Sequence, residues 1–373
     1  MKVSVLIPTF NRRDYIVQAL ESVLAQDYAD MEIIVVDDGS TDGTEDVLKP
    51  YLSAIRYIRT PNQGPALARN VGMEAAQGEY IAYLDSDDLY YPFKTRLQAE
   101  FLDEHPDVGM VYSDFSAFSD EGFWDEFHLQ TYHASAYRRG GIRYERIFSE
   151  RHPLETLQYA KADAHTGLRA WSGRSVYIGE IYRYYLFNTI VFTNSLMFRR
   201  SLLKTTGLQE RRFGMFHDLE FALRLCRQAK AAFIDLPTYK LRYHRGQIST
   251  LRNPERERVA IKLQRDLLRV IRCHVQFDRA YFLQSQAEID RQLAGLCRAV
   301  ALPLLAYANG TPHTDRCYPR RARRYLAKCR EYGQAEPVLM ALSYAPHLLR
   351  RIAFKLMEIR QNLRTRRAAR APS

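Results

Sequence analysis

The chain has 373 residues, 46% of them hydrophobic, and a formal net charge of +11. This length exceeds one ordinary domain, and the apolar content is enough for a sizeable buried core. The five cysteines include no CxxC pair, which excludes a disulfide-rich scaffold and a cysteine-based zinc site and favours a reducing, cytoplasmic location. We expect neither a signal peptide nor a membrane span, because no stretch approaches the roughly 20 apolar residues that a span requires.

Residues 1–118 are expected to alternate between strands and helices. Continuous apolar runs predict buried strands at 3–8, 32–38, 54–60 and 80–85. Apolar residues at helical spacing predict helices at 13–26, 42–52 and 64–77. This alternation is typical of a parallel sheet with helices on both faces, whose ligands bind beyond the carboxyl ends of the strands. Three strands end in polar residues, "PTFN", "DDGS" and "DSDD", so we expect the functional site at that edge.

The rest of the chain is less regular. Residues 119–187 are rich in aromatics, Arg and Gly and show weak periodicity, which predicts a long irregular insertion. Residues 188–250 predict a strand with a short helix, then an amphipathic helix at 216–229 and a strand pair at 231–244. Residues 251–373 predict helices with Arg-rich faces. They hold 25 Lys and Arg against 10 Asp and Glu, a net charge of +15.

Three carboxylates, Asp85, Asp87 and Asp88, follow the apolar run that ends near residue 84. Crowded carboxylates repel one another, so such a cluster usually shares a cation or a proton. Oxygen ligands on a short turn suit Mg²⁺ or Mn²⁺, especially where substrate phosphates complete the coordination. The alternative interpretation is structural, with Asp87 or Asp88 capping a helix that begins at Leu89.

Five other positions admit both a structural and a functional interpretation. Asp38 belongs either to an ordinary Asp-Gly turn or to a ligand site at the strand end. Gly64 permits close approach of a ligand to a helix start, and Arg69 suits a diphosphate as well as an exposed helix face. Asp218 begins an amphipathic helix and is either its N-cap or a general base. His244 follows a strand and is either structural or a ligand.

Five motifs in this order resemble the family 2 glycosyltransferases: "VSVLIPTFNR", "LESVLAQDY", "EIIVVDDGSTDGT", "NQGPALARNVGMEAAQGEYIAYLDSDD" and "HDLEFALRL". The resemblance covers about residues 1–118 and 188–250. It implies an α/β, GT-A fold with a mostly parallel central sheet flanked by helices and a helical C-terminal extension. It also implies a catalytic domain over 1–250, in which a nucleotide-sugar-binding half and an acceptor and base half enclose an acceptor-side insertion at 119–187.

The resemblance implies a donor site at the strand ends. Pro8, Thr9 and Phe10 would line the nucleobase pocket, and Asp38 would hold the base of the nucleotide sugar. The full set of residues expected at the donor is Pro8, Thr9, Phe10, Asn11, Asp38, Gly64, Arg69, Asp85 and Ser86.

The resemblance also implies a metal site and a base. Asp87 would be the direct ligand of Mn²⁺ or Mg²⁺, with Asp85 and His244 beside it. Asp218 would be the catalytic base. One departure is His217, which stands where the family usually has Glu.

The expected function is inverting, metal-dependent transfer of a sugar from a nucleotide-diphosphate sugar, with UDP favoured. The acceptor would be a hydroxyl of a glycan or lipid-linked glycan in bacterial cell-envelope polysaccharide synthesis.

A sugar-phosphate nucleotidyltransferase is the alternative enzyme, but the Gly-rich loop expected after its first strand is missing from "PTFNRRDY". A two-carboxylate hydrolase leaves the nucleotide-like strand ends unexplained. A non-catalytic basic binding protein is less favoured. We expect no nucleic-acid partner, because the basic excess is confined to 251–373 and no nucleic-acid-binding signature appears.

The segment 350–370 combines basic and apolar residues. Its apolar residues are Ile352, Phe354, Leu356, Met357 and Ile359. Two interpretations remain open: a helix lying on the anionic inner face of the cytoplasmic membrane, or a helix packed on the protein.

Overall fold

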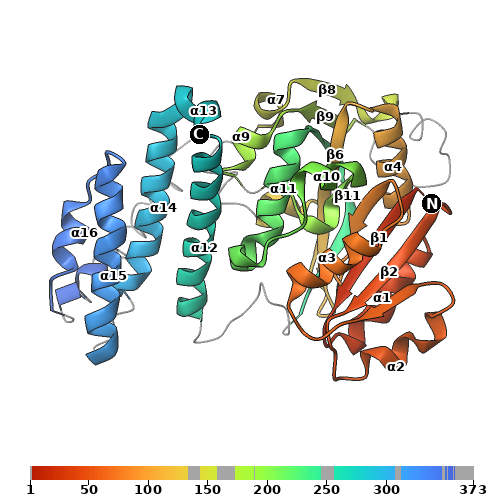
Figure 1. Cartoon of the computed structure of the whole chain (residues 1–373), viewed down its shortest axis with the longest axis horizontal. Coiled ribbons are helices and arrows are strands. Elements are labelled where there is room, and N and C mark those ends of the chain that lie inside the picture. Colours follow the sequence, from red (N-terminus) through yellow and green to blue (C-terminus); the bar gives the residue numbers. More distant parts are fainter. Residues whose placement is uncertain are drawn as a thin grey trace. The chain divides into compact units, whose positions relative to one another are not determined.

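The computed structural model describes residues 2–132, 143–157, 173–188, 190–244, 256–306, 312–346, 349–350, 352–355 and 357. The chain divides into two compact units, Met1–Leu251 and Arg252–Ser373 (Figure 1). The first unit combines a central sheet with flanking helices, and the second is helical. The expected fold class, an α/β protein with a helical C-terminal region, is confirmed.

The N-terminal half of the first unit is a parallel sheet. Its strands, in the order β3-β2-β1-β4, are β1 (Val3–Thr9), β2 (Met31–Asp37), β3 (Arg56–Arg59) and β4 (Tyr80–Tyr83). The helices that connect them are α1 (Arg13–Leu24), α2 (Thr44–Leu48) and α3 (Pro65–Ala75). Both β1 and β4 are almost wholly buried, as continuous apolar strands of a covered parallel sheet should be. These elements match the strands and helices predicted for this region.

Beyond β4 the sheet is mixed. Its further strands, in spatial order, are β10 (Met197–Arg199), β6 (Val108–Ser119), β11 (Lys230–Tyr243), β9 (Ser175–Gly179) and β8 (Glu150–Pro153). The strand β10 runs antiparallel to both β4 and β6, whereas β11 runs parallel to β6. Two short strands, β5 (Leu89–Tyr90) and β7 (Trp124–Asp125), pair with β11 and β6. The helices α4 (Lys94–Glu104) and α11 (His217–Gln228) pack against β6.

Two expectations for the second half of this unit are wrong. The strand pair predicted at 231–244 is one strand, β11, because its register shifts around Pro237 let a residue without an N–H lie inside a sheet. The insertion is not irregular throughout, because β8 and β9 join the central sheet. The described α-helices of the insertion are α5 (His128–Tyr132), α7 (Tyr144–Ile147) and α9 (Tyr182–Tyr185). The short helix that follows β10 is α10 (Leu203–Thr206).

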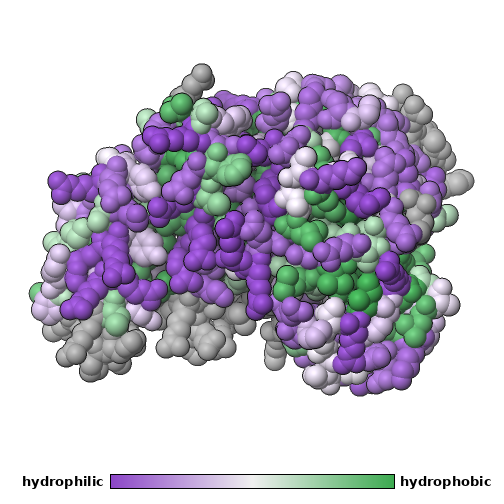
Figure 2. Space-filling view, in the orientation of Figure 1, coloured by the Kyte–Doolittle hydropathy of each residue, from purple (hydrophilic) through white to green (hydrophobic). Residues whose placement is uncertain are grey.

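The second unit is built from helices. They are α12 (Arg256–Phe277), α13 (Arg279–Phe282), α14 (Gln286–Ala306), α15 (Pro312–Glu331) and α16 (Pro337–Leu342). The apolar face of α14 packs against α12 and α15, and the visible surface of the unit is largely hydrophilic (Figure 2). Among the described residues, none of the helices is long and apolar enough to cross a membrane. The segment 350–370 lies mostly outside the described residues, so both interpretations of it stay predictions.

A buried carboxyl in β6 predicts a pH-dependent stability. Asp114 is 3% exposed, and its Oδ1 accepts the backbone N–H groups of Phe115 and Leu129 at 2.6 and 3.0 Å. Burial raises the pKa of Asp114 to about 7. The folded protein therefore holds this proton to higher pH than the unfolded chain does, so the stability from this group falls as pH rises from about 4 to 7.

We expect Asp114→Asn to remove this pH dependence, because an amide oxygen still accepts both N–H groups and does not titrate. The free energy of unfolding of the variant relative to wild type should rise by about 2 kcal/mol between pH 5 and pH 8. Chemical denaturation at the two pH values measures this difference. Asp14→Asn, at an exposed position, is the control and should show no such change. A difference that does not vary with pH would contradict the assignment.

Candidate active site

The loops that follow β1, β2 and β4 meet at one edge of the sheet. Thr9 pairs with Asp37 and Leu6 with Tyr83, so the carboxyl ends of the three strands lie side by side. Asn11 has a φ of 51°, a left-handed conformation that Asn tolerates better than most residues. Its backbone N–H donates to the Ser40 hydroxyl, and its side-chain oxygen accepts a hydrogen bond from the backbone of the neighbouring loop. These two hydrogen bonds join the "PTFN" loop to the "DDGS" loop.

Asp38 and Gly64 also lie together. The two Asp38 carboxylate oxygens accept the backbone N–H groups of Gln63 and Gly64 at 2.8 and 2.7 Å. Asp38 is 4% exposed, so it is bound to the loop before α3 rather than directed at solvent. Gly64 has a φ of 95°, and no atom lies within 4 Å of where a Cβ would be. Glycine is favoured there by the backbone conformation and not by crowding.

The residues predicted at the nucleobase differ in exposure. Phe10 is 41% exposed at the end of β1, where its ring is open to a ligand. Thr9 is 3% exposed, and its hydroxyl oxygen is buried without a hydrogen-bond partner among the described residues. Pro8 is half-buried, and Ser86 is buried in the turn of the "DSDD" cluster.

Asp85 faces a buried guanidinium. Arg69 Nη2 lies 2.6 Å from Asp85 Oδ1, and the Arg69 side chain is only 7% exposed. Burial opposes the charge of Arg69, but the carboxylates of Asp85 and Asp218 outweigh it and raise the Arg69 pKa. Arg69 therefore carries a buried positive charge beside the "DSDD" cluster.

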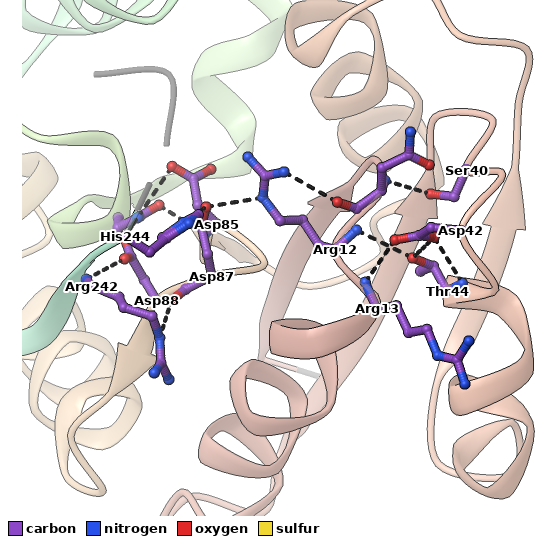
Figure 3. A network of polar contacts seen from close by, with 12 residues as sticks. Arg12, Arg13, Ser40, Asp42, Thr44, Asp85, Asp87, Asp88, Arg242 and His244 are labelled. Carbon is purple, nitrogen blue, oxygen red and sulfur yellow. Dashed lines mark hydrogen bonds and ion pairs between the residues drawn. The ribbon is translucent and has the colours of Figure 1, made fainter. Parts of the chain in front are cut away.

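Asp87 is held by two basic side chains. Its Oδ2 lies 3.1 Å from Arg12 Nε and 3.1 Å from His244 Nε2 (Figure 3). Arg12 precedes α1 and also donates from Nη1 to the Asn11 carbonyl, so it connects the "PTFN" loop with the "DSDD" cluster. The structure brings Asp87 and His244 together although 157 positions separate them in the sequence.

Asp88 lies deeper in the protein. It is 1% exposed and accepts hydrogen bonds from Asn194 Nδ2 at 2.6 Å and from the Arg242 backbone N–H at 2.9 Å. Burial and the nearby carboxylates of Asp87 and Asp85 raise the Asp88 pKa well above its usual range. The helix-capping alternative for this cluster is wrong, because the residues from Leu89 form β5 and not a helix.

Asp218 lies in the first turn of α11. Its Oδ2 accepts a hydrogen bond from the Thr193 hydroxyl at 3.0 Å, and its Oδ1 accepts the Leu219 N–H at 2.8 Å. The N-cap alternative for Asp218 is wrong, because the helix begins at His217 and its N-cap is Phe216. His217 is buried against Gln209, and burial lowers its pKa, so the ring beside Asp218 is neutral at pH 7.

The family model of "Glycosyl transferase family 2" matches residues 4–207. The chain belongs to this family. The predicted family and its GT-A, nucleotide-sugar transferase type of fold are thereby confirmed.

Several curated proteins are similar to part of this family 2 chain. TuaG of Bacillus subtilis, whose name assigns it to teichuronic acid biosynthesis, is 41% identical over 124 residues, 32% of this chain and 49% of TuaG. A glycosyltransferase of Rickettsia felis without a characterised function is 46% identical over 106 residues, 28% of this chain and 18% of that protein. The matched segments thus span less than half the length of these curated relatives.

Two solved structures also resemble the chain. TarS 1-349 of S. aureus, in complex with UDP-GlcNAc, aligns with a TM-score of 0.48 and 20% identity over 90% of this chain and 93% of TarS 1-349. The mannosyltransferase PcManGT of Pyrobaculum calidifontis, in complex with GDP-Man and Mn²⁺, aligns with a TM-score of 0.47 and 18% identity over 92% of this chain and 86% of PcManGT.

The donor atoms around Asp87 fit a divalent cation by their chemistry. Carboxylates together with an imidazole suit Mn²⁺. Within the described residues, however, no group of three or more His, Cys, Asp or Glu side chains surrounds a common position. Asp85 faces Arg69, and one oxygen of Asp87 is shared by Arg12 and His244. Cation binding therefore requires side chains of this family 2 protein to rearrange around Asp87.

Sequence reasoning missed four residues of this site. Arg12 and Arg242 are two among the many basic residues of the chain, and Thr193 and Asn194 lie in a stretch without a motif. No local signal identifies the last two, because Asn194 lies 106 positions from Asp88 in the sequence. Arg12 had a weak signal, since it ends the quoted motif "VSVLIPTFNR".

Proposed function

We propose that the protein is an inverting, metal-dependent glycosyltransferase that uses a nucleotide-diphosphate sugar as donor. The observation that carries the proposal is the buried ion pair between Arg69 and Asp85 at the strand ends. The Asp218 carboxylate, from the other half of the unit, adds to the electrostatic stabilisation of the Arg69 charge and helps to raise its pKa. A guanidinium at this place is suited to the charged diphosphate of a donor bound over the strand ends. Membership of family 2 supports the same reaction class.

Asp218 is proposed as the general base. A sugar acceptor has a hydroxyl that is a poor nucleophile, and a carboxylate that takes its proton as the new bond forms accelerates the attack. The acceptor oxygen bonds to the anomeric carbon from the face opposite the donor diphosphate. The bond from that carbon to the diphosphate oxygen breaks, and the nucleoside diphosphate leaves with the electron pair. This single displacement inverts the anomeric configuration.

The proposed metal ligands are Asp87, Asp85 and His244. Bound Mn²⁺ or Mg²⁺ would supply positive charge against the leaving diphosphate. His244 must be neutral to serve as a ligand, and Arg12 must give up its contact with Asp87 or share it. These requirements follow from the contacts that now occupy Asp87.

The donor residues are proposed from their place at the strand ends. Phe10 is exposed enough to stack on a nucleobase, and the unpartnered hydroxyl of buried Thr9 suits a hydrogen bond to it. Asn11 and Asp38 would shape this pocket through the loops that they join. We favour a UDP-linked sugar as donor. The other proposed donor residues are Pro8, Gly64, Arg69, Asp85 and Ser86.

The acceptor is proposed to be a glycan or lipid-linked glycan of the cell envelope. The name of TuaG, which refers to teichuronic acid biosynthesis, supports a polysaccharide acceptor. The insertion at 119–187 is proposed to contact this acceptor, and residues 251–373 to form a separate basic helical region. A cytoplasmic location and peripheral membrane contact through 350–370 stay predictions. Co-sedimentation with anionic vesicles, comparing the full chain with a 1–345 truncation, tests the membrane contact.

A donor screen by thermal unfolding tests the function. UDP, GDP, dTDP and CMP are each added with and without Mn²⁺. A ligand that binds only the folded state stabilises it by about 2.7 kcal/mol at one hundred times its dissociation constant, which raises Tm by several degrees. We expect one nucleoside diphosphate, with UDP favoured, to raise Tm only when Mn²⁺ is present. No stabilisation by any nucleotide under either condition would overturn the proposed function.

A further inference from the structure

The short turn η4 (Thr193–Ser195) precedes β10. It contacts both the "DSDD" cluster and the carboxylate of Asp218. Its second residue binds the "DSDD" cluster, and its first binds Asp218. No motif identifies this turn in the sequence. Its contacts give it a function that goes beyond the residues already proposed to bind the donor or to transfer a proton.

Asn194 uses its whole amide group on the "DSDD" cluster. Its Nδ2 donates to Asp88 Oδ2 at 2.6 Å and to Asp85 Oδ2 at 3.3 Å. Its Oδ1 accepts the Asp85 backbone N–H at 3.0 Å. Because Asn194 is only 4% exposed, water does not readily replace these bonds. The amide therefore sets the position of the main chain at Asp85 as well as that of two carboxylates.

Thr193 controls the other carboxylate. Its hydroxyl donates to one oxygen of Asp218, while the Leu219 N–H donates to the other oxygen. With both oxygens bound, the carboxylate plane has one preferred orientation. Since Thr193 and Asn194 are adjacent, a single peptide unit connects the orientation of Asp218 to the position of Asp85.

The turn itself is anchored in the core. The Ser195 carbonyl accepts hydrogen bonds from Gln98 Nε2 at 2.7 Å and from Lys94 Nζ at 3.4 Å, both on α4. Ser195 is fully buried, and its hydroxyl donates to the Phe192 carbonyl at 2.8 Å. These bonds restrict the movement of η4 as a whole. The turn can therefore hold the "DSDD" cluster and Asp218 at a constant distance from each other.

We propose that η4 is a positioning clamp, in which Asn194 holds Asp85 and Asp88 and Thr193 orients the base Asp218. The proposal rests on the proposed function, because it takes Asp85 as a ligand of the metal and donor and Asp218 as the base. Thr193 and Asn194 are both positioning residues, because they act through the carboxylates that they hold. Misplacement by about 1 Å of a group that takes part in the reaction can cost roughly a hundredfold in rate.

The first test separates orientation of the base from donor binding. Thr193→Val removes the hydroxyl at nearly constant volume, and we expect kcat to fall about 10- to 100-fold. The donor KM and the dissociation constant for Mn²⁺ should stay unchanged. Thr193→Ser keeps the hydroxyl and should restore kcat. Asn188→Ala, which loses one amide hydrogen bond to the Tyr184 carbonyl, is the matched control.

The second test measures the metal side without turnover. We expect Asn194→Ala to raise the dissociation constant for Mn²⁺, titrated by electron paramagnetic resonance without nucleotide, about 10- to 100-fold. Thermal unfolding checks that the variant is folded. If it is not, Asn194→Ser takes its place, because a hydroxyl cannot reproduce all three bonds that the Asn194 amide makes to Asp85 and Asp88. The clamp is overturned if the Thr193 and Asn194 variants behave like Asn188→Ala while wild type binds a nucleoside diphosphate. Wild type that binds neither Mn²⁺ nor any nucleotide overturns both the clamp and the proposed function.

Discussion

Replacing Asp218 with Asn is expected to abolish most sugar transfer while leaving donor binding intact. The amide cannot accept the proton of the acceptor hydroxyl, and loss of a general base typically costs about 10²–10⁴-fold in rate. The side chain keeps its size, and an amide oxygen still accepts one of the two bonds that now reach Asp218. The fold and the donor side should therefore persist. Initial rates at saturating donor and acceptor measure the loss.

Two measurements make this result specific. Nucleotide-induced thermal stabilisation in the presence of Mn²⁺ should match wild type, which shows that the donor site is intact. Asp14→Asn removes a carboxylate from the first turn of another helix, α1, and should leave turnover unchanged. Turnover of Asp218→Asn close to that of wild type would exclude this residue as the base and return it to a structural part in α11.

Replacing Asp87 with Ala is expected to remove the metal dependence of donor binding. Asp87 is the carboxylate that both Arg12 and His244 approach, and a cation held there would share it with the donor diphosphate. The nucleotide that stabilises wild type by several degrees with Mn²⁺ should leave the Tm of the variant unchanged. The rate of sugar transfer should also fall, because the leaving diphosphate loses the positive charge that the cation would supply.

The change in Tm on adding nucleotide and Mn²⁺ is measured separately for wild type and for Asp87→Ala. Removing Asp87 also leaves two basic side chains close together, so the basal Tm of the variant will shift for reasons unrelated to the metal. The quantity to compare is the change in Tm on adding nucleotide and Mn²⁺. Asp14→Asn again serves as control and should keep the full change. An equal Mn²⁺-dependent change in Asp87→Ala would place the metal elsewhere.

Local sequence patterns are sufficient to encode the elements of the N-terminal half of the fold. The strands β1, β2 and β4 are continuous apolar runs, and the helices between them carry their apolar residues at helical spacing, so each element is encoded locally. A parallel sheet follows from their alternation, and its polar strand ends follow from the chain order. The motifs at those ends were sufficient to predict the family.

The contacts between side chains of the site, in contrast, depend on the assembled fold. The strands β8 and β9 are paired within the central sheet although their region of sequence has weak periodicity, and β11 continues through Pro237 because neighbouring strands accept its shifts in register. The contact of Asp87 with His244 spans 157 positions, and that of Asn194 with Asp88 spans 106. Local periodicity carries no information about such pairs, because a hydrogen bond depends on distance in space and on burial. Both are set only when the whole sheet has assembled.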